Sequence, residues 1–259
     1  LCSLNTVVIA VLTVNCGLPI GISVLVALMV SMACGLLNGY LVAYLKVAPM
    51  LATLGTQSMF AGIGLVLTNG GAISGLPIGY TMIGNAKLWG VFPVQVFILV
   101  AAALVVGFVT ARTRLGRKLF LVGTSSTVAI FSGIRSARSI VLAYIISAAM
   151  SFLAAVVISS RLASGRPDVA DAFLMQSIAA AILGGASVTG GKGSVGNCIL
   201  SVLVFCILSN GLVQLLTVNA VFIENIILGL LLIVLLTGNM LNLRIFTGLS
   251  AASKVDVQA

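Results

Sequence analysis

Long stretches without a charged side chain limit what this chain can fold into more than any other feature. No charged residue precedes Lys46, and apolar segments then alternate with short polar stretches along the chain. A helix needs about 20 apolar residues to cross the hydrocarbon core of a bilayer. The apolar segments, eight in all, are roughly 4–15, 20–45, 50–69, 91–111, 138–160, 173–188, 196–217 and 222–241. This pattern predicts an all-α fold, a polytopic bundle of transmembrane helices.

The charge content leads to the same fold. Only 7% of the 259 residues are charged, whereas 61% are hydrophobic. A soluble domain carries about 25% charged residues, so most of this chain is expected to lie in lipid. We predict a single transmembrane domain over residues 1–259. The chain starts at Leu1 without a Met or a basic leader, and we therefore expect its N-terminus to be truncated.

A basic stretch from Arg112 to Arg138 predicts how the chain is oriented. It holds six of the 13 Lys and Arg residues and no Asp or Glu. A charge at mid-bilayer costs about 2.5 to 3.5 kcal/mol, so loop 112–138 must lie outside the hydrocarbon, and its positive charge predicts the cytoplasmic side. If successive segments cross the membrane in opposite directions, ten of the positive residues lie on the cytoplasmic side. Three lie outside, namely Lys87, Arg161 and Arg166.

Two of the apolar segments are short for a membrane span. Segment 4–15 ends at the break Cys16-Gly17-Leu18-Pro19, and segment 173–188 runs into the glycine-rich stretch 184–196. Segments interrupted by Gly or Pro occur in transporters as broken or re-entrant helices. We expect a short or re-entrant segment near 173–196, with a tilted short span as the alternative. For 4–15, a short or truncated span is the favoured interpretation.

Residues that carry out catalysis or bind metals are scarce. The chain has no His, and its five Cys residues lie in apolar segments without CxxC spacing, so no metal site is predicted. The stretch Gly190–Ser194 superficially resembles a phosphate-binding loop. However, Ala186 stands where that loop needs its first Gly, and Gly193 where it needs Ser or Thr. We expect no cofactor on this chain and no enzymatic activity.

Neutral polar residues inside the apolar segments are candidates for a solute pathway. Thr53, Thr56, Gln57 and Ser58 cluster in the third segment. Such side chains either hydrogen-bond neighbouring helices or line a polar path, and a path without fixed charge suits an uncharged, hydroxylated solute. The candidates for the path are Asn38, Thr53, Gln57, Gln176, Asn210 and Gln214. An ion-coupled secondary transporter of a small polar solute is the alternative. It is disfavoured because Glu224 is the one carboxylate within a predicted span.

Several stretches carry a family likeness when taken together. They are Ile178–Ser194 followed by Val195-Gly196, Leu37–Tyr44, Ala52–Thr56, Arg112–Arg117 running on to Ser132–Ile134, and Asn210–Leu212. In order and spacing the chain resembles the permease subunits of bacterial ABC importers for simple sugars. It is most similar to the ribose-type family and, within it, to permeases that import autoinducer-2. The resemblance implies about ten spans, of which about eight segments are visible here.

The resemblance also implies a function, a location and a set of partners. The chain would translocate a simple sugar or sugar-like signal (autoinducer-2, ribose or a related pentose or hexose) into the cytoplasm, as a multi-pass protein of the bacterial inner membrane. A second permease subunit, the same or paralogous, would complete the pore. A separate ABC ATPase subunit would carry ATP and Mg, and a periplasmic sugar-binding protein would deliver the solute. Membrane lipid surrounds such a protein, and no nucleic acid is expected.

In that family a short coupling helix of the cytoplasmic loop docks into a groove of the ATPase. The matching positions here are about Gly123 to Gly133. From the residues themselves, Ser125-Ser126-Thr127 can cap a short helix and Gly133 can end it. Val128, Ala129, Ile130 and Phe131 would then offer an apolar face for a partner groove. The alternative is that Ile130 and Phe131 pack on their own helix bundle.

Overall fold

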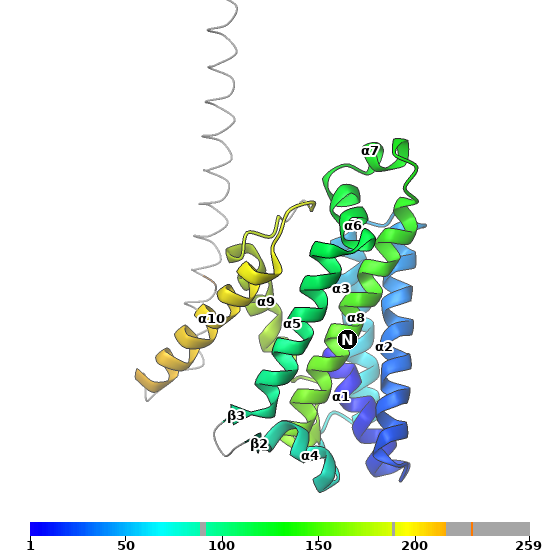
Figure 1. The fold of residues 1–259 in the computed structure, drawn as a ribbon. Helices are drawn as coiled ribbons and strands as arrows, with labels where there is room; N and C mark the ends of the chain where they lie inside the picture. The colour runs from blue at the N-terminus through cyan, green and yellow to red at the C-terminus, as the bar shows by residue number, and fades with distance from the viewer. Residues whose placement is uncertain (89–91, 188–189, 216–228, 230–259) are drawn as a thin grey trace, which may run out of the picture. The chain divides into compact units, whose positions relative to one another are not determined.

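The computed structural model describes residues 1–88, 92–187, 190–215 and 229 (Figure 1). The eighth predicted segment, 222–241, and Glu224 within it lie outside the described residues, residue 229 excepted. The chain divides into two compact units, Leu1–Asp171 and Ala172–Ala259. Each unit is described by itself.

Helices make up almost all of the first unit (Figure 1). They are α1 (Cys2–Ala10) with its π-helical continuation η1 (Val11–Asn15), α2 (Ile20–Ala43), α3 (Pro49–Thr68), α4 (Ile78–Asn85), α5 (Val94–Arg112), α6 (Arg114–Thr124), α7 (Ser126–Phe131) and α8 (Ser136–Leu162). Two antiparallel pairs of two-residue strands join them. β1 (Ile73–Ser74) pairs with β4 (Ser164–Gly165), and β2 (Lys87–Leu88) pairs with β3 (Phe92–Pro93).

Proline fixes where several of these helices begin. Pro49 is the first residue of α3, and Pro19, Pro77 and Pro93 stand directly before α2, α4 and α5. Proline lacks the N–H that the first turn of a helix cannot satisfy, and its φ angle is already near the helical value. The predicted segment edges therefore fall within a few residues of the observed ones for α2, α3 and α5.

Within the described residues, α2, α3, α5 and α8 are the helices long and apolar enough to cross a membrane. The longest, α8, has 27 residues, or about 40 Å of helix against about 30 Å of hydrocarbon. The predicted all-α, membrane-spanning architecture is confirmed to this extent. The total of eight segments, and of ten in the whole protein, stays a prediction. Shorter apolar helices cover Cys2–Asn15, Phe173–Leu183 and Val195–Leu208.

The most extensive helix–helix contact in the first unit joins α2 to α8. A Cβ atom on Gly35 would lie 2.6 Å from Cβ of Ala148, and one on Gly39 would lie 2.9 Å from Cα of Val141. Two glycines one turn apart thus let the two backbones approach closely. The hydrophobic core of this unit holds Ile9, Ala27, Leu76, Tyr80 and Phe152.

The ends of the first unit separate its charged loops. Gly39 near the end of α2 faces Val141 near the start of α8, so the turn at Lys46 and the loop 112–138 share one end (Figure 1). At the other end, Nδ2 of Asn85 lies 3.4 Å from the carbonyl oxygen of Arg161. This separation of the two ends agrees with the predicted alternation.

The second unit contains α9 (Asp171–Leu183) and α10 (Val195–Leu215). The first residue of α9, Asp171, is also the last residue of the first unit. A Cβ atom on Gly184 would lie 2.7 Å from Cα of Cys198, which shows that the two helices pack closely just after α9 ends. Ala179, Ala180 and Phe205 form a small core between them. With 13 residues, α9 is about 20 Å long, shorter than the hydrocarbon. The predicted shortness is confirmed, and a re-entrant path stays a prediction.

Candidate functional site

The loop between α5 and α8 is folded into two short helices rather than left irregular. Thr113 is the single residue between α5 and α6, and its hydroxyl accepts a hydrogen bond from the backbone N–H of Gly116 at 3.3 Å. Gly116 is buried against the backbone of Thr110 in α5, where any side chain would collide. Helix α6 therefore turns back on the end of α5, directly at the point where α5 ends.

Helix α7 is capped at both ends, as predicted. The hydroxyl of Ser125 accepts a hydrogen bond from the N–H of Val128 at 3.3 Å. At the other end Gly133 has a φ angle of +73°, its N–H donates to the carbonyl of Ile130 at 3.0 Å, and the N–H of Ile134 donates to the carbonyl of Ala129 at 3.0 Å. These two bonds form the Schellman motif, which stops a helix at a left-handed glycine. A helix of six residues is thus held in one conformation.

Three of the four apolar residues of α7 face outward, and the prediction that Ala129 belongs to the outward face is wrong. Phe131 is 88% exposed and Ile130 62% exposed, and Val128 is also exposed, whereas Ala129 is 1% exposed. Gly123, at the end of α6, is half-buried and Gly133 is exposed. The alternative prediction, that Ile130 and Phe131 pack on their own helix bundle, is not what the structure shows. An exposed cluster of large apolar side chains at a loop tip is typical of a contact surface.

The candidate residues for a solute pathway fall in both units. In the first, Asn38 is buried and its Oδ1 accepts a hydrogen bond from the hydroxyl of Thr56 at 2.7 Å, joining α2 to α3. Thr53 donates within its own helix, to the carbonyl oxygens of Pro49 at 2.9 Å and Met50 at 3.1 Å. Gln57 is half-buried on α3. Asn38 therefore contacts α3 through Thr56, a residue outside the predicted pathway set.

The remaining three pathway candidates lie in the second unit. Gln176 is half-buried on α9, and Gln214 is exposed on α10. The side-chain N–H of Asn210 donates to the carbonyl of Cys206 at 2.8 Å, one turn earlier on α10. Asn210 and Gln214 stand four residues apart, on one face of that helix.

A polar connection through α1 was not predicted. The side-chain amide of Asn5 donates to the hydroxyl of Ser31 at 3.1 Å, and that hydroxyl donates to the carbonyl of Ala148 at 2.9 Å. All of these groups are buried, and they tie α1, α2 and α8 together. The signal in the sequence is the adjacent polar pair Asn5-Thr6 near the start of a mainly apolar segment.

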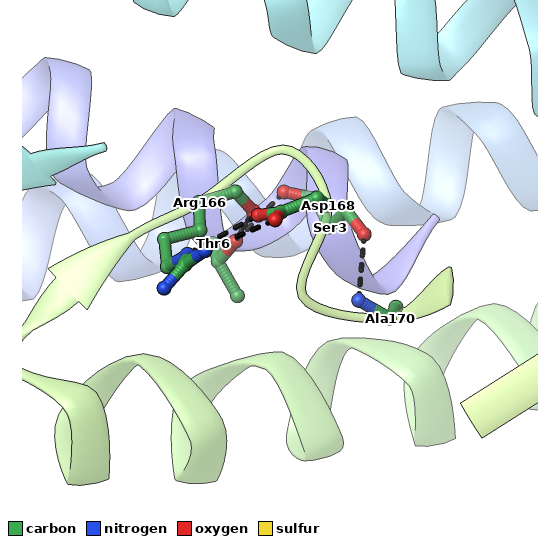
Figure 2. Close-up of polar contacts among 5 residues, drawn as sticks. All are labelled: Ser3, Thr6, Arg166, Asp168 and Ala170. Carbon is green, nitrogen blue, oxygen red and sulfur yellow. Dashed lines mark hydrogen bonds and ion pairs between the residues drawn. The ribbon is translucent and has the colours of Figure 1, made fainter. Parts of the chain in front are cut away.

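The loop after α8 is fastened to α1 by several polar contacts (Figure 2). The hydroxyl of Thr6 lies 3.1 Å from the carbonyl oxygen of Arg166, and the N–H of Ala170 donates to the hydroxyl of Ser3 at 3.2 Å. Arg166 forms a two-pronged ion pair with Asp168, at 3.2 and 3.0 Å. The hydrogen bond from this guanidinium lowers the pKa of the Asp168 carboxyl below its ordinary value.

The model of a protein family described as the branched-chain amino acid transport system permease component matches residues 4–236. The chain belongs to this permease family. The permease is 36% identical to the autoinducer 2 import system permease protein LsrD of Yersinia enterocolitica serotype O:8 over 233 residues, which are 88% of this chain and 70% of that protein. LsrD of Yersinia pseudotuberculosis serotype O:3 is 35% identical over 88% of this chain and 69% of its own length. No solved structure matches the permease.

The family membership agrees with the expected class of protein. Its members and the relatives are transport permeases, so the permease is a transport subunit in the membrane rather than an enzyme. In the described part of the permease, no three His, Cys, Asp or Glu side chains come together in a way that could hold a metal ion. The family model and the LsrD relatives confirm the predicted resemblance to import permeases.

Proposed function

We propose that this permease is the membrane-spanning subunit of an ATP-binding-cassette importer in the bacterial inner membrane. Its cargo would be autoinducer-2 or a related simple sugar such as ribose, carried into the cytoplasm. The cargo assignment is supported by the LsrD relatives, whose names state autoinducer 2 import. Energy would come from a separate ABC ATPase subunit that binds ATP and Mg.

The observation that carries the proposal is the outward apolar face of α7. Ile130 and Phe131 are exposed to solvent at the end of the unit where the positive residues of loop 112–138 gather. Leaving a phenylalanine in water is unfavourable, and a groove on a partner protein would bury it. An ATPase subunit on the cytoplasmic side is the partner that an importer requires.

The structure suggests how movement of α7 would reach the membrane-spanning helices. Both ends of α7 are capped, so the helix would move as one piece. Ile134 and Arg135 alone separate its Schellman turn at Gly133 from α8, which packs closely on α2 through Gly35 and Gly39. A shift of α7 by the motor would therefore tilt α8 together with α2. Two permease copies, or two paralogues, would move in this way to open the pore to one side and then to the other.

The neutral polar residues are the proposed lining of the solute pathway. Thr53 and Gln57 lie one turn apart on α3, and Asn38 approaches that helix from α2. Gln176, Asn210 and Gln214 are the remaining candidates for this lining. Hydroxyl and amide groups of this kind can hydrogen-bond a hydroxylated solute without holding a charge in the membrane. A periplasmic sugar-binding protein would deliver that solute.

The proposal is tested by asking which proteins bind the permease and what stimulates them. The tagged permease is purified in mild detergent with its native partners, reconstituted in lipid, and assayed for ATP hydrolysis. We expect an ABC ATPase to copurify, and its activity to rise several-fold when a sugar-loaded binding protein is added. Solute uptake that needs no ATPase and is abolished by a protonophore would contradict the proposal and favour the ion-coupled alternative.

A further inference from the structure

We propose that helix α6 lies in the plane of the membrane surface and binds the headgroups of anionic phospholipids. This inference does not depend on the transported solute or on the ATPase. It rests on the charge, the exposed apolar side chains and the position of α6.

The positive charges around α6 have no acidic partner in the described structure. Arg112, Arg114, Arg117 and Lys118 are all exposed, and no Asp or Glu occurs in the sequence before Asp168. At the opposite end of the first unit, Arg166 is paired with Asp168 at 3.0 Å. The concentration of unneutralised positive charge is therefore particular to the α6 end, where it complements a negatively charged surface.

Exposed apolar side chains accompany these charges on the same short helix. Leu115, Phe120 and Leu121 are exposed, while Gly116 is buried against the end of α5. Leu121 follows Arg114 by seven residues and Arg117 by four, so it lies on the face that carries the basic side chains. A helix that presents basic and large apolar side chains together is typical of the boundary between headgroups and acyl chains.

The position of α6 matches that boundary. Thr113 alone separates it from α5, one of the helices long enough to cross a membrane, so α6 begins where the hydrocarbon ends. The exposed rings of Tyr40 and Tyr44 stack at 5.3 Å between centroids, near the end of α2 that shares this side of the unit. Tyrosine is enriched at the interface between membrane and water. Two independent features thus place the membrane surface at the level of α6.

Anionic lipid is favoured over a protein partner as the occupant. The neighbouring helix α7 exposes apolar side chains without basic ones, as a protein groove requires, whereas α6 mixes both kinds. Phosphodiester headgroups would meet Arg114, Arg117 and Lys118, and the first carbons of the acyl chains would cover Leu121, which lies among them. Leu115 and Phe120 flank this face, one on each side. Acidic phospholipid would then hold the start of the loop in place next to α7.

Native mass spectrometry of the purified full chain, titrated with phosphatidylglycerol or with phosphatidylcholine, tests this inference. Each basic side chain near an anionic surface strengthens binding by about fivefold. We expect the triple variant Arg114→Gln/Arg117→Gln/Lys118→Gln to weaken the tightest phosphatidylglycerol binding by at least about tenfold, with phosphatidylcholine binding unchanged. The matched control, Lys87→Gln/Arg161→Gln/Arg166→Gln, removes the same charge elsewhere and should keep nearly the wild-type affinity.

Two further measurements keep the test decisive if the triple variant folds poorly. The charge-retaining variant Arg114→Lys/Arg117→Lys should bind phosphatidylglycerol like the wild type. Raising the salt concentration should weaken phosphatidylglycerol binding by the wild type and by this variant, because both keep the α6 charge, and should have much less effect on the triple variant. Equal losses in the triple variant and in its control would overturn the proposal. So would a wild type that binds both lipids equally, or a copurified ATPase that binds the triple variant at least tenfold more weakly while lipid binding stays unchanged.

Discussion

The hydroxyl of Thr56 on α3 donates a hydrogen bond of 2.7 Å to the side-chain oxygen of Asn38 on α2, and both residues are buried. We expect Thr56→Val to lower the free energy of unfolding by about 1 kcal/mol, because the amide oxygen loses its partner inside the protein. Thr53→Val is the matched control, since Thr53 bonds only within its own helix. Thermal unfolding in detergent measures both, and equal losses would contradict a specific link between α2 and α3.

The close approach of α2 and α8 predicts that a larger residue at position 35 destabilises the protein. A Cβ atom at residue 35 would lie 2.6 Å from Cβ of Ala148 and 3.0 Å from the carbonyl oxygen of Tyr144. Gly35→Ala should therefore destabilise the protein by about 1 to 3 kcal/mol through overpacking. Gly55→Ala on α3 meets no atom within 4 Å and should be neutral or stabilising by up to about 1 kcal/mol. A stable Gly35→Ala protein would show that the two helices are further apart than described.

The caps of α7 predict which substitutions destabilise this helix. Gly133→Ala places a Cβ in the left-handed region, at a cost of about 1 to 2 kcal/mol, and Ser125→Ala removes an N-cap worth about 1 kcal/mol. We expect faster hydrogen exchange of the amides of residues 126–131 in both variants. Gly107→Ala is the control, because no heavy atom lies within 4 Å of its added Cβ. Unchanged exchange in the Gly133 variant would mean that the Schellman turn does not hold α7.

The Arg166–Asp168 ion pair predicts a pH dependence at the other end of the molecule. The hydrogen bond from Arg166 lowers the pKa of Asp168 in the folded protein, so the carboxylate supports the loop above the ordinary Asp pKa, near about 4. That support is lost as the pH falls through the lowered pKa. Arg166→Gln should raise the pKa of Asp168 towards its ordinary value, as measured by a carboxyl carbon NMR titration. Because both groups are exposed, the effect on stability should be small.

The sequence predicted the long helices well because lipid imposes a simple rule on them. A span must be apolar over its whole length, so α2, α3, α5 and α8 were visible as uncharged runs bounded by Pro, Gly or basic residues. The short helix α7 was also predictable from its cap residues, Ser125 and Gly133. These signals are local, so they can be recognised in the sequence without knowing what each helix packs against.

Contacts between distant segments were beyond the reach of the sequence. Ser3 and Ala170 are 167 residues apart in the chain, and nothing in their local sequence says that they meet. The sequence shows that Thr56 is polar, but that its hydrogen-bond partner is Asn38 depends on how α2 and α3 pack against each other. The basic residues of α6 predict topology, and the period of Leu115, Leu119 and Val122 is the local signal that also predicts an amphipathic helix there.

Uptake of radiolabelled solute by the reconstituted transporter tests most directly whether the ATPase drives import through α7. The permease is incorporated in lipid vesicles with its ATPase and binding protein, and uptake is compared with and without ATP. We predict that Ile130→Asp/Phe131→Asp abolishes ATP-dependent uptake while the protein stays folded in the membrane. Ile78→Asp, at an exposed residue of α4, should leave uptake largely intact. ATP-dependent uptake by the Ile130→Asp/Phe131→Asp variant at the wild-type rate would show that the ATPase does not drive import through α7.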